Sequence, residues 1–244
     1  MVKQLAFLMC SPRGDKSASH SIGSYVASLF EEQNIGVKTF EVYKTLRKQE
    51  RIEEMIKSID ECDIILLSSP LYIDQAPYMT IKLMDIISEA FKHSKIQNKT
   101  RHLFAISNAG FLEYYHNNLA LKIYEQFAIQ NELIWAGGLP IGAAGTYATY
   151  PIPEFLKMLA QLPEDDYRQE IYHKPTKILD SVIKTSVNHL SKGEVVPKDV
   201  LQKLEFIPMP LESYVEGGNK TWSKAAEQYD VVDKLRDKPY ELEN

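Results

Sequence analysis

The segment Asp63-Ile64-Ile65-Leu66-Leu67-Ser68-Ser69 decides the fold class of this chain. Four aliphatic residues follow one another, without the polar residue at every second position that is typical of a strand with one face in water. A continuous apolar run of this length indicates a strand that is covered on both of its faces. We therefore expect residues 63–69 to form an interior strand of a parallel sheet.

Apolar strand-like segments alternate with helical segments on both sides of this strand. The expected strands are 2–9, 37–43, 63–69, 103–107 and 132–141, and the expected helices start near Ser19 and cover 52–59, 77–93, 119–130 and 175–190. Parallel strands need a crossover connection, which is usually a helix, and these crossovers are right-handed. The alternation therefore predicts a doubly wound α/β fold with helices on both faces of the sheet.

The composition limits the class of partner. Of the 244 residues, 44% are hydrophobic and 25% are charged, and 28 basic against 33 acidic residues give a formal net charge of −5. A chain without a bulk positive charge has no field that would attract nucleic acid or an anionic membrane, so we expect neither partner and instead a small molecule.

The strand and helix alternation stops at about residue 147, which indicates how the chain is organised. We expect one large domain over 1–192, with an insertion at about 147–174, followed by a helical C-terminal extension over 193–244 that packs on the core or on a second subunit. The uncharged stretch 133–153 has the length of a membrane span. Its many glycines and prolines would break a helix in lipid, so we expect a buried strand and a loop there.

The two cysteines, Cys10 and Cys62, exclude several classes of site. They form no CxxC motif, which argues against a disulfide scaffold, structural zinc and iron–sulfur ligation. Cys10 ends its strand and Cys62 precedes its own, so the two side chains would lie at opposite edges of the sheet, about 20 Å apart. That separation is too large for a disulfide. We expect a reduced, cytosolic chain.

The loop 11–21 follows the first strand and has the composition of a phosphate site. It places several serines, a glycine and two cations directly before a helix. Backbone N–H groups and the helix dipole at such a position favour a phosphate. Neither a GxxxxGK[ST] nor a GxGxxG motif is present, so a nucleoside triphosphate is not expected. A capped turn with Arg13 and Lys16 in solvent remains an alternative.

The loops 68–77 and 107–115 follow the third and fourth strands and therefore lie at the same edge of the sheet. Both are rich in apolar and aromatic residues, which could line a flat ring system while backbone amides bind the ring's heteroatoms. Asn108 and Gly110 permit a close backbone approach to such a ring. The aromatic side chains could instead pack on the tail or within a lid. A phosphate site and a ring site at the same edge of the sheet are together the features that FMN requires.

With these motifs in view, the chain resembles the NAD(P)H-dependent FMN reductase-like oxidoreductases of flavodoxin-like fold. Residues 11–13, with Ser17 and Ser19, are similar to their phosphate loop, and 69–72, followed by Pro77 and the stretch 82–85, are similar to their flavin-ring loop and helix. Segments 106–111 and 135–138 are also similar, and the tail from 218–222 to 238–240 looks like the ending of one bacterial branch. Cys10 stands where that family often has glycine.

The resemblance implies a five-stranded parallel sheet of order 2-1-3-4-5, FMN as cofactor, and NADPH or NADH as co-substrate. It implies cofactor contacts from the phosphate loop and from both ring loops. The implied residues are Ser11, Arg13, Ser17, Ala18 and Ser19 for the phosphate, and Pro70, Leu71, Tyr72, Ile73, Asn108, Ala109, Gly110 and Phe111 for the ring. Because the flavin N5 performs the chemistry, no catalytic side chain and no metal are expected.

The implied activity is that of an FMN-dependent NAD(P)H oxidoreductase, similar to flavin or quinone reductases, which passes electrons to a small acceptor across a face shaped by Tyr72 and Phe111. A flavodoxin-like electron carrier and a binding or regulatory module without turnover are the alternatives. The aromatic residues of the extension suit docking on a core or a second subunit, so we also expect a homodimer or higher homo-oligomer whose tail helps to cover the flavin. These residues are Tyr214, Trp222, Tyr229 and Tyr240.

Overall fold

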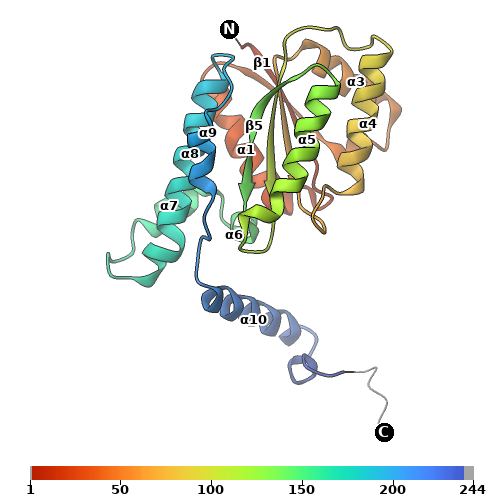
Figure 1. Ribbon diagram of the computed structural model, residues 1–244. Helices are drawn as coiled ribbons and strands as arrows, with labels where there is room; N and C mark the ends of the chain where they lie inside the picture. Colours follow the sequence, from red (N-terminus) through yellow and green to blue (C-terminus); the bar gives the residue numbers. More distant parts are fainter. Residues whose placement is uncertain (1, 239–244) are drawn as a thin grey trace. The chain divides into compact units, whose positions relative to one another are not determined.

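The computed structural model describes residues 2–238 and contains one five-stranded sheet with helices on both sides (Figure 1). The strands are β1 (Gln4–Met9), β2 (Gly36–Glu41), β3 (Ile64–Pro70), β4 (His102–Asn108) and β5 (Ile134–Ile141). They are ordered β2-β1-β3-β4-β5, and every neighbouring pair is parallel. The predicted doubly wound fold and its strand order are confirmed.

The predicted helices are present, with ends that differ by a few residues from the expected ones. They are α1 (Ala18–Glu31), α3 (Gln49–Glu61), α4 (Tyr78–Lys92), α5 (Asn118–Gln130) and α8 (Lys174–Leu190). The sequence indicated short helical pieces after about residue 147 without their bounds, and it did not indicate a helix directly after the second strand. The short helices are α2 (Val42–Thr45), α6 (Gly145–Thr149), α7 (Ile152–Leu159) and α9 (Lys198–Leu201). The expected strand 37–43 ends at Glu41 because α2 begins at Val42.

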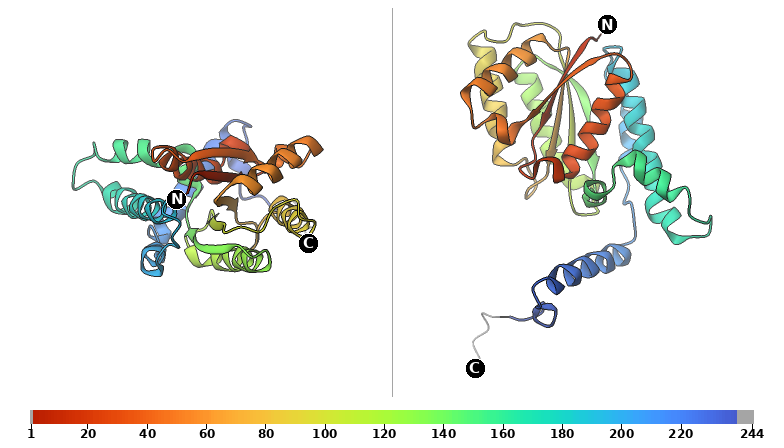
Figure 2. Two further views of the ribbon diagram at one scale, coloured as in Figure 1. Left: turned by 90° about the horizontal axis from the view of Figure 1, so that it is seen from above. Right: turned by 180° about the vertical axis from the view of Figure 1, so that it is seen from behind.

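The sheet is buried on both faces, and different helices cover each face (Figure 2). Leu5, Phe7 and Met9 of β1 pack with α1, α7 and α8, whereas Ala6 and Leu8 pack with α3, α4 and α5. Successive side chains of a strand point to opposite faces. This arrangement explains why the segment 63–69 is apolar at consecutive positions, since neither of its faces meets water.

Helix α1 lies unusually close to the sheet at Gly23. A Cβ added to Gly23 would lie 2.3 Å from Phe7 Cζ and 3.2 Å from Ser68 Cβ. No larger residue fits between this helix and the strands β1 and β3 unless the Phe7 ring or the helix itself shifts. This close packing sets the position of the first turn of α1 relative to the carboxyl ends of β1 and β3.

Arg101 is a fully buried cation just before β4, and its hydrogen bonds hold the end of α3. Its Nε donates to Ile59 O (2.9 Å), and its Nη2 donates to Asp60 O (2.6 Å) and Asp60 Oδ1 (3.0 Å). Carbonyls at the end of a helix lack intrahelical donors, and a cation there also opposes the helix dipole favourably. Arg101 therefore joins the end of α3 to the start of β4.

The described chain divides into two compact units, one ending at Pro208 and one starting at Met209. The first unit holds the sheet and continues past residue 192, because Val196, Val200 and Leu204 are buried in the same cluster as α8. The second unit contains α10 (Leu211–Glu227), which confirms a helical C-terminal part. Among residues 2–238, none of the helices combines the length and the hydropathy of a membrane span.

Candidate functional site

The three loops singled out in the sequence leave the same edge of the sheet and are hydrogen-bonded to one another. Cys10 N donates to Ser68 O (2.8 Å), Leu71 N donates to Asn108 O (2.8 Å), and Ala109 N donates to Ile141 O (2.8 Å). The parallel register of β1, β3, β4 and β5 thus extends one residue into each connection. The loops after β1, β3 and β4 form one continuous surface at the carboxyl edge, where ligands of such sheets bind.

Asn108, the last residue of β4, joins all three loops. Its Nδ2 donates to Ser19 Oγ (2.8 Å) in α1 and to Ser69 O (3.0 Å) in β3. Nearby, Ser68 Oγ donates to Ser19 O (2.8 Å). All of these groups are buried, where an unpaired polar group would be costly. The first turn of α1 is therefore held in a defined position against the ends of β3 and β4.

The start of α1 presents free backbone donors to the carboxyl edge. Ser17 is the N-cap: its Oγ accepts a hydrogen bond from His20 N (3.1 Å) and donates to Gly14 O (2.7 Å). The preceding amides, those of Ala18 and Ser19, have no intrahelical acceptor because no helical carbonyl lies one turn before them. Together with the helix dipole, these amides are donors of the kind that can bind an anion.

The predicted phosphate residues divide into two groups. The Ser17 hydroxyl donates its proton to Gly14 O, and the Ser19 side chain is fully buried against Asn108. Both side chains therefore hold the conformation of the loop. Arg13 and Lys16 are exposed, and the Ser11 Oγ accepts from Arg13 N (3.3 Å) while its own proton has no acceptor among the described residues. The backbone amides, Ser11 and the two cations are thus the groups that can donate to an anion.

The β3–α4 loop contains a strained two-residue turn. Tyr72 N donates to Gln75 O (2.8 Å), and the two residues between them, Ile73 and Asp74, have φ angles of 48° and 61°. Two successive positive φ angles define a type I′ turn, which Gly and Asn favour. A β-branched residue in that conformation costs on the order of 1–3 kcal/mol, yet Ile73 is 96% exposed. Strain of this kind is concentrated at functional sites.

The turn leaves backbone donors and apolar side chains at the carboxyl edge. In the described part of the chain, the amides of Ile73 and Asp74 donate to no acceptor. Tyr72 is exposed, whereas Pro70 and Leu71 are half-buried beneath it. The loop therefore combines free N–H groups with an apolar surface, as the sequence predicted for a ring-binding loop.

The loop after β4 is held by backbone hydrogen bonds from the residues that follow β5. Ala143 N donates to Phe111 O (2.6 Å), and Ala144 N donates to Ala109 O (2.9 Å). A Cβ added to Gly142 would lie 2.2 Å from Leu112 O, so only glycine permits this contact. Ala109 is buried, while Gly110 and Phe111 are exposed, with Phe111 at 65%. The structure thus brings Phe111 and Tyr72 to the same edge with their rings in solvent.

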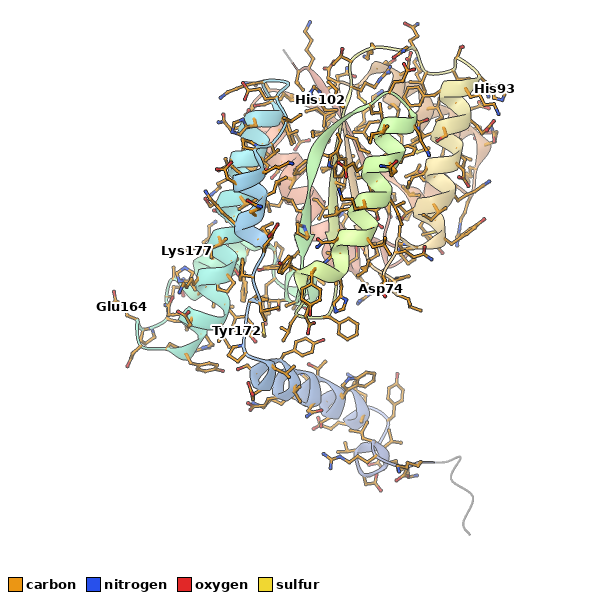
Figure 3. All side chains as sticks on the ribbon, viewed as in Figure 1. Asp74, His93, His102, Glu164, Tyr172 and Lys177 are labelled. Atoms are coloured by element: carbon orange, nitrogen blue, oxygen red, sulfur yellow. The ribbon has the colours of Figure 1, made fainter. Side chains whose placement is uncertain are left out.

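His116 lies between the two ring loops, a position that the sequence did not reveal. Its Nδ1 is 3.8 Å from Asp74 Oδ1, and its ring contacts Phe111 and Tyr115 with centroid distances of 6.0 and 5.0 Å. Figure 3 shows Asp74 at this end of the sheet and His102 at the opposite end. No local motif joins Asp74 to His116, because the pair forms only when β3 and β4 lie side by side. His116 adds a protonatable side chain to the rim of the site.

A metal site is not found in the part of the chain that the structure describes. Within residues 2–238, no three His, Cys, Asp or Glu side chains gather closely enough to hold a metal ion. Apart from the Asp74 carboxylate and the His116 imidazole, the groups named at the carboxyl edge are hydroxyls, amides, exposed cations and aromatic rings. These groups suit an organic phosphate with a planar ring better than a metal ion.

The structure resembles solved structures of flavodoxin-like proteins, although no protein-family model and no curated protein matches the sequence. An NADH:FMN oxidoreductase in its apo form is 12% identical, with a TM-score of 0.52 over 87% of this chain and 98% of that chain. An FMN-dependent NADH-azoreductase from Bacillus anthracis in complex with FMN is 11% identical, with a TM-score of 0.47 over 78% of this chain and 100% of that chain.

A flavodoxin, WrbA-like protein from Agrobacterium tumefaciens is 13% identical, with a TM-score of 0.44 over 63% of this chain and 95% of that chain. At these identities the likeness concerns the fold. The strand order β2-β1-β3-β4-β5 and the likeness to the NADH:FMN oxidoreductase, at a TM-score of 0.52, confirm the flavodoxin-like fold that the sequence resemblance implied.

Proposed function

We propose that this chain binds FMN at the carboxyl edge of its sheet and acts as an NAD(P)H-dependent oxidoreductase that passes electrons to a small acceptor. The observation that carries this proposal is the position of Asn108, which holds the phosphate loop at Ser19 and the first ring loop at Ser69. A ligand that fits this edge needs an anionic group at the start of α1 and a planar group between the two ring loops. FMN has both groups.

The residues present fit FMN. The amides of Ala18 and Ser19, the Ser11 hydroxyl and Arg13 would hold the phosphate, since all of them are donors at the start of α1. The amides of Ile73 and Asp74 would donate to ring heteroatoms, and Pro70, Leu71, Ala109 and Gly110 would line the ring. When bound, FMN supplies the ability to accept a hydride and release electrons singly or in pairs.

The protein's own contribution is position and access. The buried hydrogen bonds of Asn108 fix the distance between the phosphate and ring sites, and the contacts of residues 142–144 keep the β4 loop in place. Tyr72 and Phe111 have exposed rings at the rim, so they shape the face on which a nicotinamide or an acceptor would lie. Such pre-positioning of reactants is how a protein accelerates a cofactor's reaction.

The comparisons support this proposal at the level of the fold. The names of the similar solved structures include an NADH:FMN oxidoreductase and an FMN-dependent NADH-azoreductase. The two cysteines are free, which fits the reducing cytosol that we propose as its compartment.

The test is to add FMN to the purified full chain and then to add NADH or NADPH without oxygen. We expect tight uptake of FMN, a raised melting temperature and rapid bleaching of the flavin absorbance by the nicotinamide. Arg13→Gln should weaken FMN binding several-fold and make it less dependent on salt, whereas Lys198→Gln, which removes an exposed cation in α9, should leave it unchanged.

Other outcomes of this test would favour an electron carrier or a module without turnover. FMN uptake with bleaching only after a separate reductase is added would indicate an electron carrier. A chain that neither takes up FMN nor gains thermal stability from it would be a binding or regulatory module, and the proposed oxidoreductase activity would then be wrong.

We also propose that the chain forms a homodimer or higher homo-oligomer through its second unit. Apolar side chains along α10 are exposed, among them Leu211, Val215 and Trp222. Exposed apolar patches of this kind mark interaction surfaces. Tyr240, which the sequence analysis grouped with these anchors, lies outside the described residues. If a chain that ends at Pro208 has the same oligomeric state as the full chain in light scattering, this proposal is incorrect.

A further inference from the structure

The segment between β5 and α8 encloses a pocket that the proposed FMN site does not use. It lies between α6, α7 and a π-helical turn (Gln169–His173), and it has a volume of about 290 Å³. Its walls include Thr146, Thr149, Tyr150, Phe155, Arg168 and Tyr172. This volume is near the lower end of the range for small-molecule sites, which suits one part of a larger ligand.

Three aromatic rings form a preorganised wall of this pocket. Tyr150 stacks on Phe155 with a centroid distance of 5.2 Å and an interplanar angle of 15°, and Tyr172 meets Phe155 edge-on at 5.9 Å. Phe155 is buried, whereas Tyr150 is 44% exposed. One face of the Tyr150 ring is therefore covered by Phe155, and much of the remainder is open. A ring held in this way is a stacking platform for a planar base.

Arg168 supplies oriented hydrogen-bond donors beside this platform. Its Nε and Nη2 donate to Asp166 Oδ1 (2.9 Å) and Oδ2 (2.6 Å), which fixes the plane of the guanidinium. A guanidinium has five N–H donors, so this pairing leaves three of them for another acceptor. Because the negative charge of Asp166 offsets the positive charge of Arg168, the pair would recognise a ligand through directed hydrogen bonds more than through net charge. A flat ring together with oxygen acceptors is the chemistry of a purine nucleotide.

The chain just before one wall of the pocket is hydrogen-bonded to the β4 loop of the FMN site. Ala144 N donates to Ala109 O (2.9 Å), and α6 begins at the next residue, Gly145. Figure 1 shows α6 at the carboxyl end of β5. At a rise of about 1.5 Å per residue, Thr149 lies about 8 Å along the chain from Ala144. A ligand with two linked parts could therefore reach both the pocket and the β4 loop.

We propose that this pocket binds the adenosine half of the nicotinamide dinucleotide. Adenine stacks on the open face of Tyr150, and the free N–H groups of Arg168 donate to phosphate oxygens of that half, while the nicotinamide half extends to Tyr72 and Phe111. This inference rests on the proposed function, because it assigns a second subsite to the same co-substrate.

The experiment compares Tyr150→Ser and Arg168→Gln with two matched controls in the full chain. Tyr167→Ser removes an exposed tyrosine next to Arg168 that does not line the pocket, and Lys157→Gln removes an exposed cation of α7. The probes are ADP-ribose, measured by calorimetry, and NADPH, NADH and reduced nicotinamide mononucleotide, measured by flavin bleaching. Far-UV circular dichroism and melting temperature establish that each variant is folded.

We expect Tyr150→Ser to weaken ADP-ribose binding by about five- to tenfold, the lower end of the range for loss of one base-stacking ring. The KM for the dinucleotide should rise by a similar factor with an unchanged kcat, because the lost contact stabilises bound substrate and transition state equally. Reduced nicotinamide mononucleotide, which lacks adenosine, should react equally with all variants. Arg168→Gln should act in the same direction, and both controls should match the unmodified chain.

Two results would overturn the assignment of the pocket. One is unchanged ADP-ribose affinity and KM in both pocket variants; the other is an equal loss with the mononucleotide, which would place the effect at the ring loops. If FMN is taken up and bleached in either case, the proposed function stands and only this inference fails. If FMN is never bound, the proposed function fails, and ADP-ribose binding that depends on Tyr150 still decides whether the pocket takes an adenosine group.

Discussion

Asn108 Nδ2 donates a 2.8 Å hydrogen bond to Ser19 Oγ across 89 residues of sequence. Both residues are buried at the point where α1, β3 and β4 meet, and the same amide also donates to Ser69 O at 3.0 Å. The phosphate loop and the first ring loop therefore share one buried anchor. The geometry of the candidate FMN site depends on this anchor more than on any exposed residue.

Asn108→Ala should lower the free energy of unfolding by about 1–3 kcal/mol, because it leaves Ser19 Oγ buried without the amide donor of Asn108. FMN affinity should fall as the loops separate. Ser19→Ala removes the partner, so the double variant should cost less than the sum of the single variants. Urea unfolding of all four chains gives the coupling energy, and strictly additive losses would show that the bond has no anchoring role.

Gly142→Ala should distort the β4 loop, since its Cβ would lie 2.2 Å from Leu112 O. We expect a loss of stability of about 1–3 kcal/mol, as for other overpacked positions, together with weaker FMN binding. Gly145→Ala is the matched control, because an added Cβ there meets nothing within 4 Å. The two variants are compared by thermal melting and by FMN fluorescence titration. Equal behaviour of the pair would contradict the claimed contact.

Ile73→Asn should stabilise the protein by up to about 1 kcal/mol, because asparagine tolerates the left-handed conformation that Ile73 adopts with a φ of 48°. The side chain of Ile73 is exposed, so its removal loses little packing. Tyr72→Asn, at a neighbouring exposed position without a positive φ, should show no such gain. Urea midpoints of the two variants check this prediction, and a destabilised Ile73→Asn chain would mean that the turn is not strained by its side chain.

Cys10 and Cys62 should resist thiol reagents while the chain is folded. Burial raises the pKa of each thiol to about 12, so almost no thiolate is present at neutral pH. A colorimetric disulfide reagent at pH 8 should react with neither cysteine in the native protein and with both in urea. Rapid labelling of the native chain would show that one of these residues is accessible.

His102 should make the protein less stable in mild acid. Burial lowers the pKa of this imidazole, so the folded chain resists a proton that the unfolded chain accepts near pH 6.5. The free energy of unfolding should therefore be constant above about pH 7 and decline as the pH falls through that value. His102→Gln should flatten this decline. Urea titrations of the two chains between pH 5 and 8 check this prediction, and an equally steep decline in both would contradict it.

The sequence by itself determined the fold class and the edge of the sheet at which the site lies. Continuous apolar runs such as 63–69 require burial on both faces, and that requirement together with the alternating helices leaves a parallel sheet as the simple solution. Because the carboxyl ends of parallel strands meet at one edge, the sequence alone groups the loops after β1, β3 and β4.

Only the tertiary structure decided what the individual site residues do. Ser17 and Ser19 look equivalent in the sequence, yet one caps α1 and the other is a buried partner of Asn108. Likewise, Asp74 meets His116, and Tyr150 stacks on Phe155 beside Tyr172, through contacts between separate elements. The spacing of apolar residues along a segment indicates which face of that segment is buried. It carries no information on which polar or aromatic side chains meet, because that depends on the packing of elements far apart in the chain.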